Sequence, residues 1–189
     1  MIVILEGIDN SGKTTLINKL IKETFPDFSC KVLNDKDVAH YKALYKVRYD
    51  FTFFARNVAL LELAKAYNDS GLYHFVFIDR CFLSYAIYNV IKDCDDYELK
   101  ANTCVDFVRD YCHIILYQQE IEAKATEIWS LDVLASQNHC FKAFADSIPR
   151  AILVAKEHID DTDWSSMLNN ERARRSIEMK KKRLENRDV

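Results

Sequence analysis

Residues 7 to 14 read Gly-x-x-x-x-Gly-Lys-Thr, a pattern typical of loops that bind the phosphates of a nucleotide. Gly7 and Gly12 allow the backbone to turn tightly, so that consecutive N–H groups converge on phosphate oxygens. Lys13 would reach the β- and γ-phosphates as a point charge, and the hydroxyl of Thr14 would hold Mg²⁺. This phosphate-binding loop, the P-loop, also contains Asn10, Ser11 and Thr15, which are expected to contact the same ligand.

The residues on either side of the P-loop support this interpretation. The apolar run at 2–5 predicts a buried strand before the loop, and apolar residues at 16, 17, 20 and 21 recur at helical spacing after it. A helix that begins at the loop adds the positive end of its dipole to the phosphate site. The alternative, a glycine-rich turn with a solvated lysine, is disfavoured by this strand-to-helix context.

Composition and charge exclude several other classes of protein. The 189 residues suffice for one domain with a normal hydrophobic core. The net charge of -3 gives no overall positive field for nucleic acid, so any such contact must be local. The six cysteines form no Cys-x-x-Cys pair, and no apolar run approaches the roughly 18 residues of a membrane span. We expect a reduced, cytoplasmic protein without a secretory leader or a membrane partner.

The order of strands and helices indicates an α/β fold. Apolar runs predict five strands, at 2–5, 29–33, 74–78, 113–117 and 151–155. Helical periodicity predicts helices after the P-loop, at 50–69, 83–91, 98–111, 120–129 and 130–145, and from 164 onward, with a further short helix starting at 34–37. Alternating strands and helices imply a parallel sheet with right-handed crossovers. No repeat or linker interrupts residues 1–189, so we predict a single domain.

Asp79 and Arg80 follow the apolar strand at 74–78 directly. Open α/β sheets bind their ligands at the carboxyl ends of parallel strands, so these two side chains are candidates for a ligand site. The alternative is a surface ion pair, which the strand-end position disfavours.

Two segments of the chain, EGIDNSGKTT at 6–15 and DRCFLSYAIY at 79–88, resemble the thymidylate kinase family and its nucleoside and nucleotide kinase relatives. In that family the loop reads like EGxDxxGKTT, and a later strand ends in Asp-Arg followed by a Ser and an Ala-Tyr segment. The resemblance implies a three-layer sandwich with a five-stranded parallel sheet, the fold of P-loop NTPases of the nucleoside monophosphate kinase type. It also implies a small lid around 119–136 and ATP with Mg²⁺ as cofactors.

The resemblance implies a catalytic role for four residues. Lys13 would bind the donor phosphates, and Asp9 would lie near the acceptor or order a metal-bound water. Asp79 would support Mg²⁺ beside Thr14. Arg80 would bind the oxyanion of the acceptor. Such clustered charges suit phosphoryl transfer, which needs electrostatic stabilisation and little covalent help.

On the acceptor side the resemblance implies a pocket lined by Ser84 and Tyr88, with Arg56 facing the acceptor. Phe53, or a neighbouring phenylalanine at 51 or 54, would stack on a base. An aromatic cluster on a helix is equally typical of a hydrophobic core.

The sequence departs from the family in its acceptor and lid segments. The family's Arg-Glu-Pro-Gly segment after the second strand is absent, and residues 33–37 read LNDKD. The aromatic residue four positions before the helix arginine is replaced by Thr52. Lid arginines are missing from 120–136, where Lys124 is the only cation and is expected to bind the donor. Arg48 and Lys92 are further candidates for the missing charge.

The C-terminal segment is locally basic. We predict a basic helix over 164–187, and its cations are Arg172, Arg174, Arg175, Lys180, Lys181, Lys182 and Arg183. Glutamates interleave with them, so a solvated helix face is favoured over a nucleic-acid patch. The helix at 50–69 can serve equally as a homodimer face or as an internal helix.

Three functions are consistent with these features. The first is an ATP-dependent kinase of a thymidine-type pyrimidine deoxynucleotide, with dTMP as the default acceptor. The second is a kinase of the hydroxymethyl group of a modified pyrimidine within DNA, resembling phage enzymes that act in the host cytoplasm. It would explain the basic tail and both missing motifs together. The third is a P-loop module that binds or hydrolyses nucleotide and signals through a partner.

Overall fold

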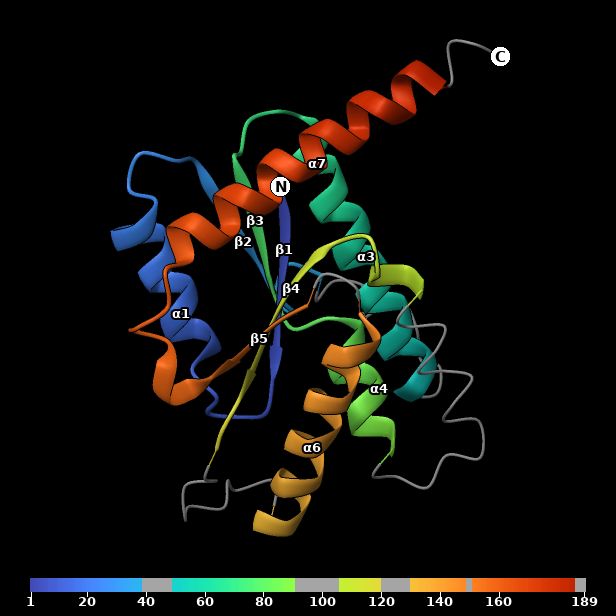
Figure 1. The fold of residues 1–189 in the computed structure, drawn as a ribbon. Coiled ribbons are helices and arrows are strands. Elements are labelled where there is room, and N and C mark those ends of the chain that lie inside the picture. The colour runs from blue at the N-terminus through green and yellow to red at the C-terminus, as the bar shows by residue number, and fades with distance from the viewer. Residues whose placement is uncertain (39–48, 91–105, 120–129, 149–150, 186–189) are drawn as a thin grey trace.

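The computed structural model describes residues 1–38, 49–90, 106–119, 130–148 and 151–185. Five strands form one parallel sheet between two layers of helices (Figure 1). The strands are β1 (Ile2–Gly7), β2 (Cys30–Leu33), β3 (Phe75–Asp79), β4 (Cys112–Tyr117) and β5 (Ala151–Ala155). The helices are α1 (Lys13–Lys19), which continues as the π-helix η1 (Leu20–Thr24), α3 (Tyr49–Asp69), α4 (Phe82–Val90), α6 (Leu131–Ser147), the 3-10 helix η2 (Lys156–His158) and α7 (Trp164–Glu185).

The order of strands in the sheet is β2-β3-β1-β4-β5, so β1 lies at the centre. Leu5 of β1 pairs with Asp79 of β3, and Gly7 pairs with Leu116 of β4. The P-loop and the Asp79-Arg80 pair therefore leave the sheet side by side, at its carboxyl edge. This is the edge at which parallel sheets bind ligands.

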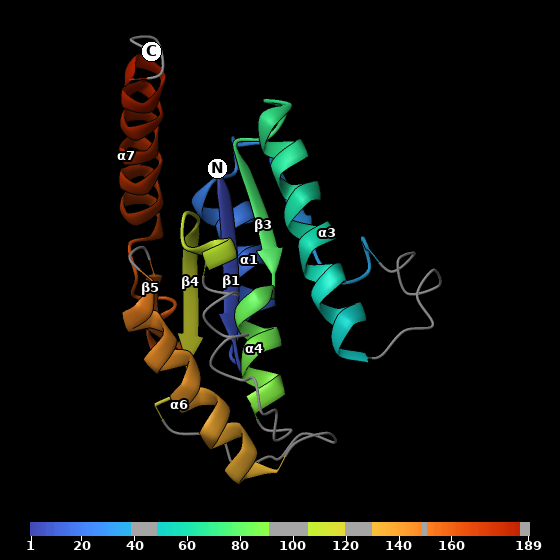
Figure 2. The same ribbon diagram turned by 90° about the vertical axis from the view of Figure 1, so that its right-hand side faces the viewer.

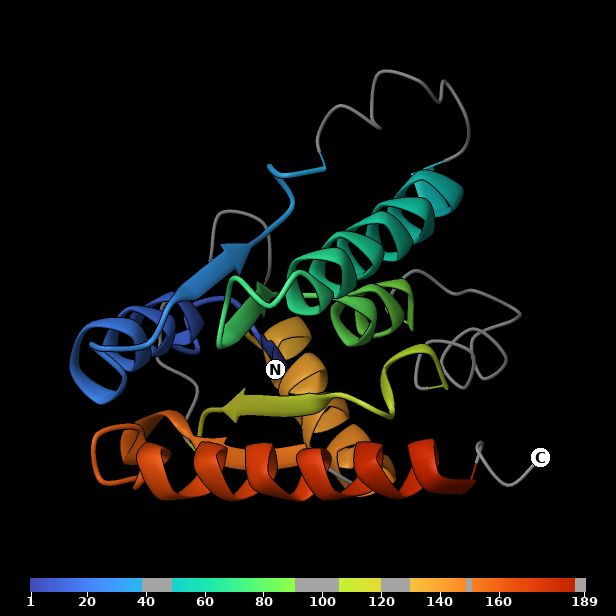
Figure 3. The ribbon, with the colours of Figure 1, turned by 90° about the horizontal axis from the view of Figure 1, so that it is seen from above.

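Alternate residues of β1 face opposite helical layers. Ile2 and Ile4 pack in the same core cluster as Leu60 of α3, whereas Val3 and Leu5 pack in a second cluster with Leu16 of α1 and with Trp164 and Leu168 of α7. Figures 2 and 3 show the result: α7 and α3 lie on opposite sides of the molecule, with the sheet between them. The predicted three-layer sandwich with a five-stranded parallel sheet is confirmed. The central strands β1, β3 and β4 are almost entirely buried, as expected where both faces are covered, whereas the edge strands β2 and β5 are partly accessible.

The short helix predicted to start at 34–37 extends into residues 39–48, which lie outside the described residues, so it stays a prediction. Residues 35–38 form a turn. The Asn34 side chain accepts a hydrogen bond from the N–H of Lys36 at 2.9 Å, and Asp37 accepts one from the N–H of Asn34 at 2.8 Å. Side-chain to backbone hydrogen bonds of this kind occur in turns and at the first turn of helices.

Other predicted elements are described only in part. The helix predicted for 98–111 is described from residue 106, where it is helical to 108 and then turns. The helix predicted for 120–129 lies outside the described residues, as does most of the predicted lid at 119–136. The lid therefore stays a prediction.

The close packing of the P-loop on β4 predicts different costs for two glycine substitutions. A Cβ on Gly7 would lie 2.3 Å from the Leu116 carbonyl oxygen, and φ there is +143°, whereas Gly71 has φ of +71° and nothing within 4 Å of a Cβ. Gly71→Ala should cost about 1–2 kcal/mol of unfolding free energy through backbone strain alone. Gly7→Ala should cost at least about 2 kcal/mol more, because a backbone carbonyl must also move. Urea denaturation measures both, and equal losses would contradict the packing argument.

Candidate active site

The P-loop lysine is held by the loop itself. Gly12, at φ of +89°, caps the start of α1, and Lys13 is the first residue of that helix. The Lys13 Nζ donates hydrogen bonds to the carbonyl oxygens of Gly7 at 3.0 Å and Ile8 at 2.6 Å, and to Ser11 Oγ at 3.2 Å. Its side chain is buried, and this burial lowers the pKa of Lys13 to about 7.

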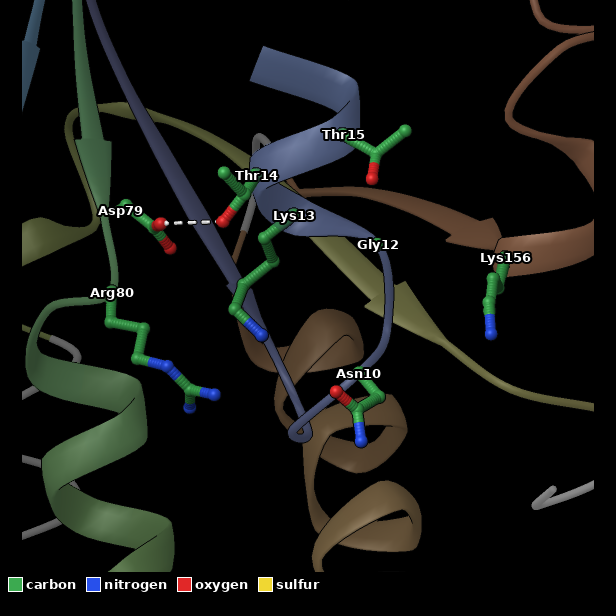
Figure 4. Close-up of a pocket in the computed structure, with 8 residues that line it drawn as sticks. All are labelled: Asn10, Gly12, Lys13, Thr14, Thr15, Asp79, Arg80 and Lys156. Carbon is green, nitrogen blue, oxygen red and sulfur yellow. Dashed lines mark hydrogen bonds between the residues drawn. The ribbon is translucent and has the colours of Figure 1, made fainter. Parts of the chain in front are cut away.

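A cavity of about 390 Å³ opens beside this loop, within the range of small-molecule sites. Figure 4 shows residues of the P-loop and of two other strand ends converging on it. The lining residues are Asn10, Gly12, Lys13, Thr14, Thr15, Asp79, Arg80 and Lys156. We call this space the donor cavity.

One wall of the donor cavity suits a magnesium ion. Thr14 Oγ1 donates a hydrogen bond to Asp79 Oδ2 at 3.2 Å (Figure 4). The other carboxylate oxygen, Asp79 Oδ1, is buried and has no hydrogen-bond partner among the residues described. Because Mg²⁺ binds hydroxyl and carboxylate oxygens and retains several waters, an unsatisfied carboxylate oxygen beside a threonine hydroxyl fits that ion.

Arg80 faces the P-loop from the end of β3. Its φ is +71°, which is rare for a residue with a side chain, and its N–H donates to the Leu5 carbonyl at 2.9 Å. The guanidinium forms an ion pair with Asp9, donates to the Gly7 carbonyl at 3.2 Å and hydrogen-bonds the hydroxyl of Tyr88. The structure therefore brings four predicted residues together. Asp9 and Tyr88 each contact Arg80 directly, and Asp79 precedes Arg80 in the chain.

Glu6 is a buried carboxylate that sequence analysis did not single out. It is fully buried, and its Oε1 accepts hydrogen bonds from the N–H groups of Cys81 at 2.9 Å and Leu83 at 3.1 Å. Its Oε2 accepts one from the Ser84 hydroxyl. Burial raises the pKa of Glu6 in spite of these donors. Glu6 thus joins the end of β1 to the start of α4.

A second cavity, of about 200 Å³, lies on the other side of Asp79 and Arg80. It is lined by Asn34, Asp35, Asn57, Asp79, Arg80, Cys81 and Ser84. Because Asp79 and Arg80 line both cavities, a group bound in one lies next to a group bound in the other. We call this second space the acceptor cavity.

Arg56 reaches the edge of the acceptor cavity from α3. Its guanidinium is buried and forms an ion pair with Asp35, a cavity residue whose side chain is 64% exposed. Ser84 lies on the lining as predicted, although its hydroxyl is engaged by Glu6.

Of the phenylalanines predicted to stack on a base, Phe54 packs inside the protein instead. Phe54 packs in the core against Phe82 and Tyr85, at ring centroid distances of 5.5 and 6.0 Å, so it is a core residue. The side chain of Phe53 lies outside what the structure describes, and its role stays a prediction.

Two further site residues were missed. Gln118, directly after β4, donates from Nε2 to the carbonyl of Asn10 at 3.2 Å and so supports the P-loop. Lys156, directly after β5, lines the donor cavity, with its Cγ 3.9 Å from a Cβ built on Gly12. Both follow a strand at its carboxyl end, which is the signal that singled out Asp79. Lys124, Arg48 and Lys92 lie outside the described residues.

No family model matches the sequence, and no curated protein resembles it significantly. Several solved structures do resemble the fold of this chain. A thymidylate kinase from Candida albicans aligns with a TM-score of 0.58 at 17% identity, over 90% of this chain and 92% of that one. A thymidylate kinase from Ehrlichia chaffeensis aligns with a TM-score of 0.59 at 17% identity, over 82% and 86%. This protein has a thymidylate kinase-like P-loop fold. At such identity the likeness establishes the fold alone.

Other predicted surfaces are described only in part. In α7, Arg172 lies over the ring of Phe28, with its Cζ 5.5 Å from the centroid, and Arg174 pairs with Glu171 at 2.7 Å. These two cations are therefore engaged within the chain. No helix among the described residues is long and apolar enough to span a membrane, and no cluster of three metal-ligating side chains occurs among them. The homodimer at α3 stays a prediction.

Loss of the Glu6 carboxylate should destabilise the protein. Glu6→Ala leaves two buried N–H groups without their acceptor, so we expect the unfolding free energy to fall by at least about 2 kcal/mol. Glu62→Ala is the matched control, because Glu62 pairs with Lys65 on the exposed face of α3 and should cost less than about 1 kcal/mol. Equal losses in urea denaturation would contradict the bridging role of Glu6.

The low pKa of Lys13 predicts that Lys13 takes up a proton when a phosphate ligand binds. A pKa of about 7 leaves Lys13 largely neutral at pH 8, and a bound anion favours its charged form, so binding should weaken as pH rises above 7. Calorimetry with ADP at pH 8, in buffers of different ionisation enthalpy, measures the uptake. Lys13→Arg stays charged and should bind ADP with little uptake. Wild-type binding without uptake would refute the prediction.

Proposed function

We propose that the protein is an ATP-dependent kinase that transfers the γ-phosphate of ATP to a pyrimidine deoxynucleotide-type acceptor. The observation that carries the proposal is the pair of cavities that share Asp79 and Arg80. A donor in the first would present its terminal phosphate to a group in the second, with Arg80 beside both. Phosphoryl transfer requires this juxtaposition and clustered cations more than covalent chemistry.

Different residues of the chain would bind the donor, position the metal ion and stabilise the transferring group. Lys13 and the P-loop amides would hold the donor phosphates, while Thr14 and Asp79 would position Mg²⁺, which neutralises charge on the phosphates when bound. Lys156 would supply a second cation on the donor side, where Lys124 was expected. Arg80 would stabilise charge on the transferring group, and its pairing with Asp9 and Tyr88 holds it in place.

The default acceptor is dTMP, as the resemblance implies. The second candidate, a hydroxymethyl pyrimidine within DNA, is favoured by one observation: Arg56, the helix arginine expected to face the acceptor, is paired with Asp35. The third candidate, a P-loop module without transfer, gives no role to the acceptor cavity beside Arg80.

Transfer of label from γ-labelled ATP tests the proposal. Wild-type protein should phosphorylate one of a panel of pyrimidine nucleosides, nucleoside monophosphates and hydroxymethylated oligonucleotides. Lys13→Ala should reduce kcat/KM by about a hundredfold or more. Lys19→Ala, in the same helix, is the control, because Lys19 pairs with Asp160 on the surface and its loss should change the rate by less than about twofold. Release of free phosphate alone, with no labelled acceptor, would support the third reading.

A further inference from the structure

We infer that Asn138 of α6 is a positioning residue for donor binding, which acts through Gln118 to hold the P-loop in the shape that receives phosphate. Neither residue is among the described residues that line the donor cavity or the acceptor cavity. The inference rests on the proposed function, and extends it from residues that would touch the donor to residues behind them.

The main chain of Gln118 is held by a single side chain of α6. Gln118 directly follows β4, whose pairing ends at Leu116 on the β1 side and at Tyr117 on the β5 side. The Gln118 N–H donates to Asn138 Oδ1 at 3.0 Å, and Asn138 Nδ2 donates to the Gln118 carbonyl oxygen at 2.9 Å. The side-chain amide of Asn138 thus takes the place of a neighbouring strand and fixes residue 118 at both of its backbone polar groups.

The side chain of Gln118 carries this constraint to the P-loop. Its Nε2 donates to the carbonyl oxygen of Asn10 at 3.2 Å. Gln118 is 4% exposed and Asn138 is 8% exposed, so little water competes for these hydrogen bonds. Three amide contacts therefore connect α6 to the P-loop through the end of β4.

The carbonyl that Gln118 holds belongs to a peptide group that shapes the loop. Asn10 lines the donor cavity, and its φ is +62°, which is uncommon for a residue with a side chain. The N–H of the same peptide group, that of Ser11, donates to the Ile8 carbonyl oxygen at 3.3 Å. That oxygen also accepts the hydrogen bond from Lys13 Nζ. A peptide group released by Gln118 could rotate, and would then misdirect the loop that binds the donor phosphates.

Calorimetric titration of the full chain with ADP tests the inference. Gln118→Met removes the donor to the P-loop and keeps both backbone hydrogen bonds to Asn138, so the fold is retained. Its ADP affinity should fall by about three- to tenfold, the effect of one hydrogen bond. Asn138→Ala should cause a similar fall. Asn138→Asp, which keeps the acceptor and loses the donor, replaces it if the alanine variant does not fold.

The double variant shows whether Asn138 acts through Gln118. If it does, combining the two substitutions should weaken ADP binding no more than the larger single effect. Additive losses would overturn the inference, and so would an ADP affinity equal to that of wild type in Gln118→Met.

Lys142→Ala is the matched control in the same helix. Lys142 Nζ lies 4.7 Å from the ring centroid of Tyr117, so this variant loses a contact between α6 and β4 one residue before Gln118. Its ADP affinity should stay within about twofold of wild type. A loss as large as that of Asn138→Ala would show that any loosening of α6 suffices, and would overturn the inference.

Kinetics separate positioning from a merely structural role. With γ-labelled ATP and the acceptor that the wild type uses, the two single variants should raise KM for ATP by about three- to tenfold and leave kcat within about twofold. A structural role would instead reduce the folded fraction, which lowers kcat and leaves KM unchanged, and this result would overturn the inference.

Failure of the proposed function gives a different result. Wild-type protein that binds no ADP overturns the proposed function, and the inference with it. Wild-type protein that binds ADP but labels no acceptor overturns the kinase alone, because the ADP titrations still test the role of Asn138.

Discussion

The buried carboxylate of Glu6 is the constraint on which the site depends. It accepts hydrogen bonds from the start of α4, and it precedes the first P-loop glycine in the chain. The turn that carries Arg80 lies between β3 and α4, so the same carboxylate fixes where Arg80 can point. A positive φ at Arg80 costs roughly 1–2 kcal/mol, and it persists because the residues on both sides of it are tied to β1. The relative position of the phosphate loop and its facing arginine is thereby built into the core.

Burial also sets the electrostatics of the donor side. Lys13 is enclosed by the carbonyl and hydroxyl oxygens of its own loop, and burial lowers its pKa toward neutrality. Three oxygens in contact favour the ammonium form, whereas the loss of solvent opposes it. An incoming phosphate supplies the missing countercharge. A bound phosphate would therefore raise the pKa of Lys13 and favour its charged form.

The elements of the fold could be predicted because their signals are local. Each strand is a short apolar run, and the P-loop is a contiguous pattern, so neighbouring residues suffice to find them. Features that arise when distant segments of the chain meet could not be predicted from the sequence. Glu6 reads as the last residue of a strand until α4 is placed against it, and Phe54 reads as a base-stacking ring until Phe82 and Tyr85 surround it.

The rule that ligands bind at the carboxyl ends of parallel strands identifies more site residues than the sequence motifs do. Asp79 is the last residue of β3, and Gln118 and Lys156 directly follow β4 and β5; each lines the donor cavity or supports its loop. Applied to every strand, the rule would have found all three. It does not show which charges neutralise one another, because Asp35 and Arg56 are 21 positions apart and are brought together only by the packing of α3 beside the end of β2. Phosphate binding can therefore be inferred from a motif, whereas the ion pair of Arg56 with Asp35 is revealed only by the tertiary structure.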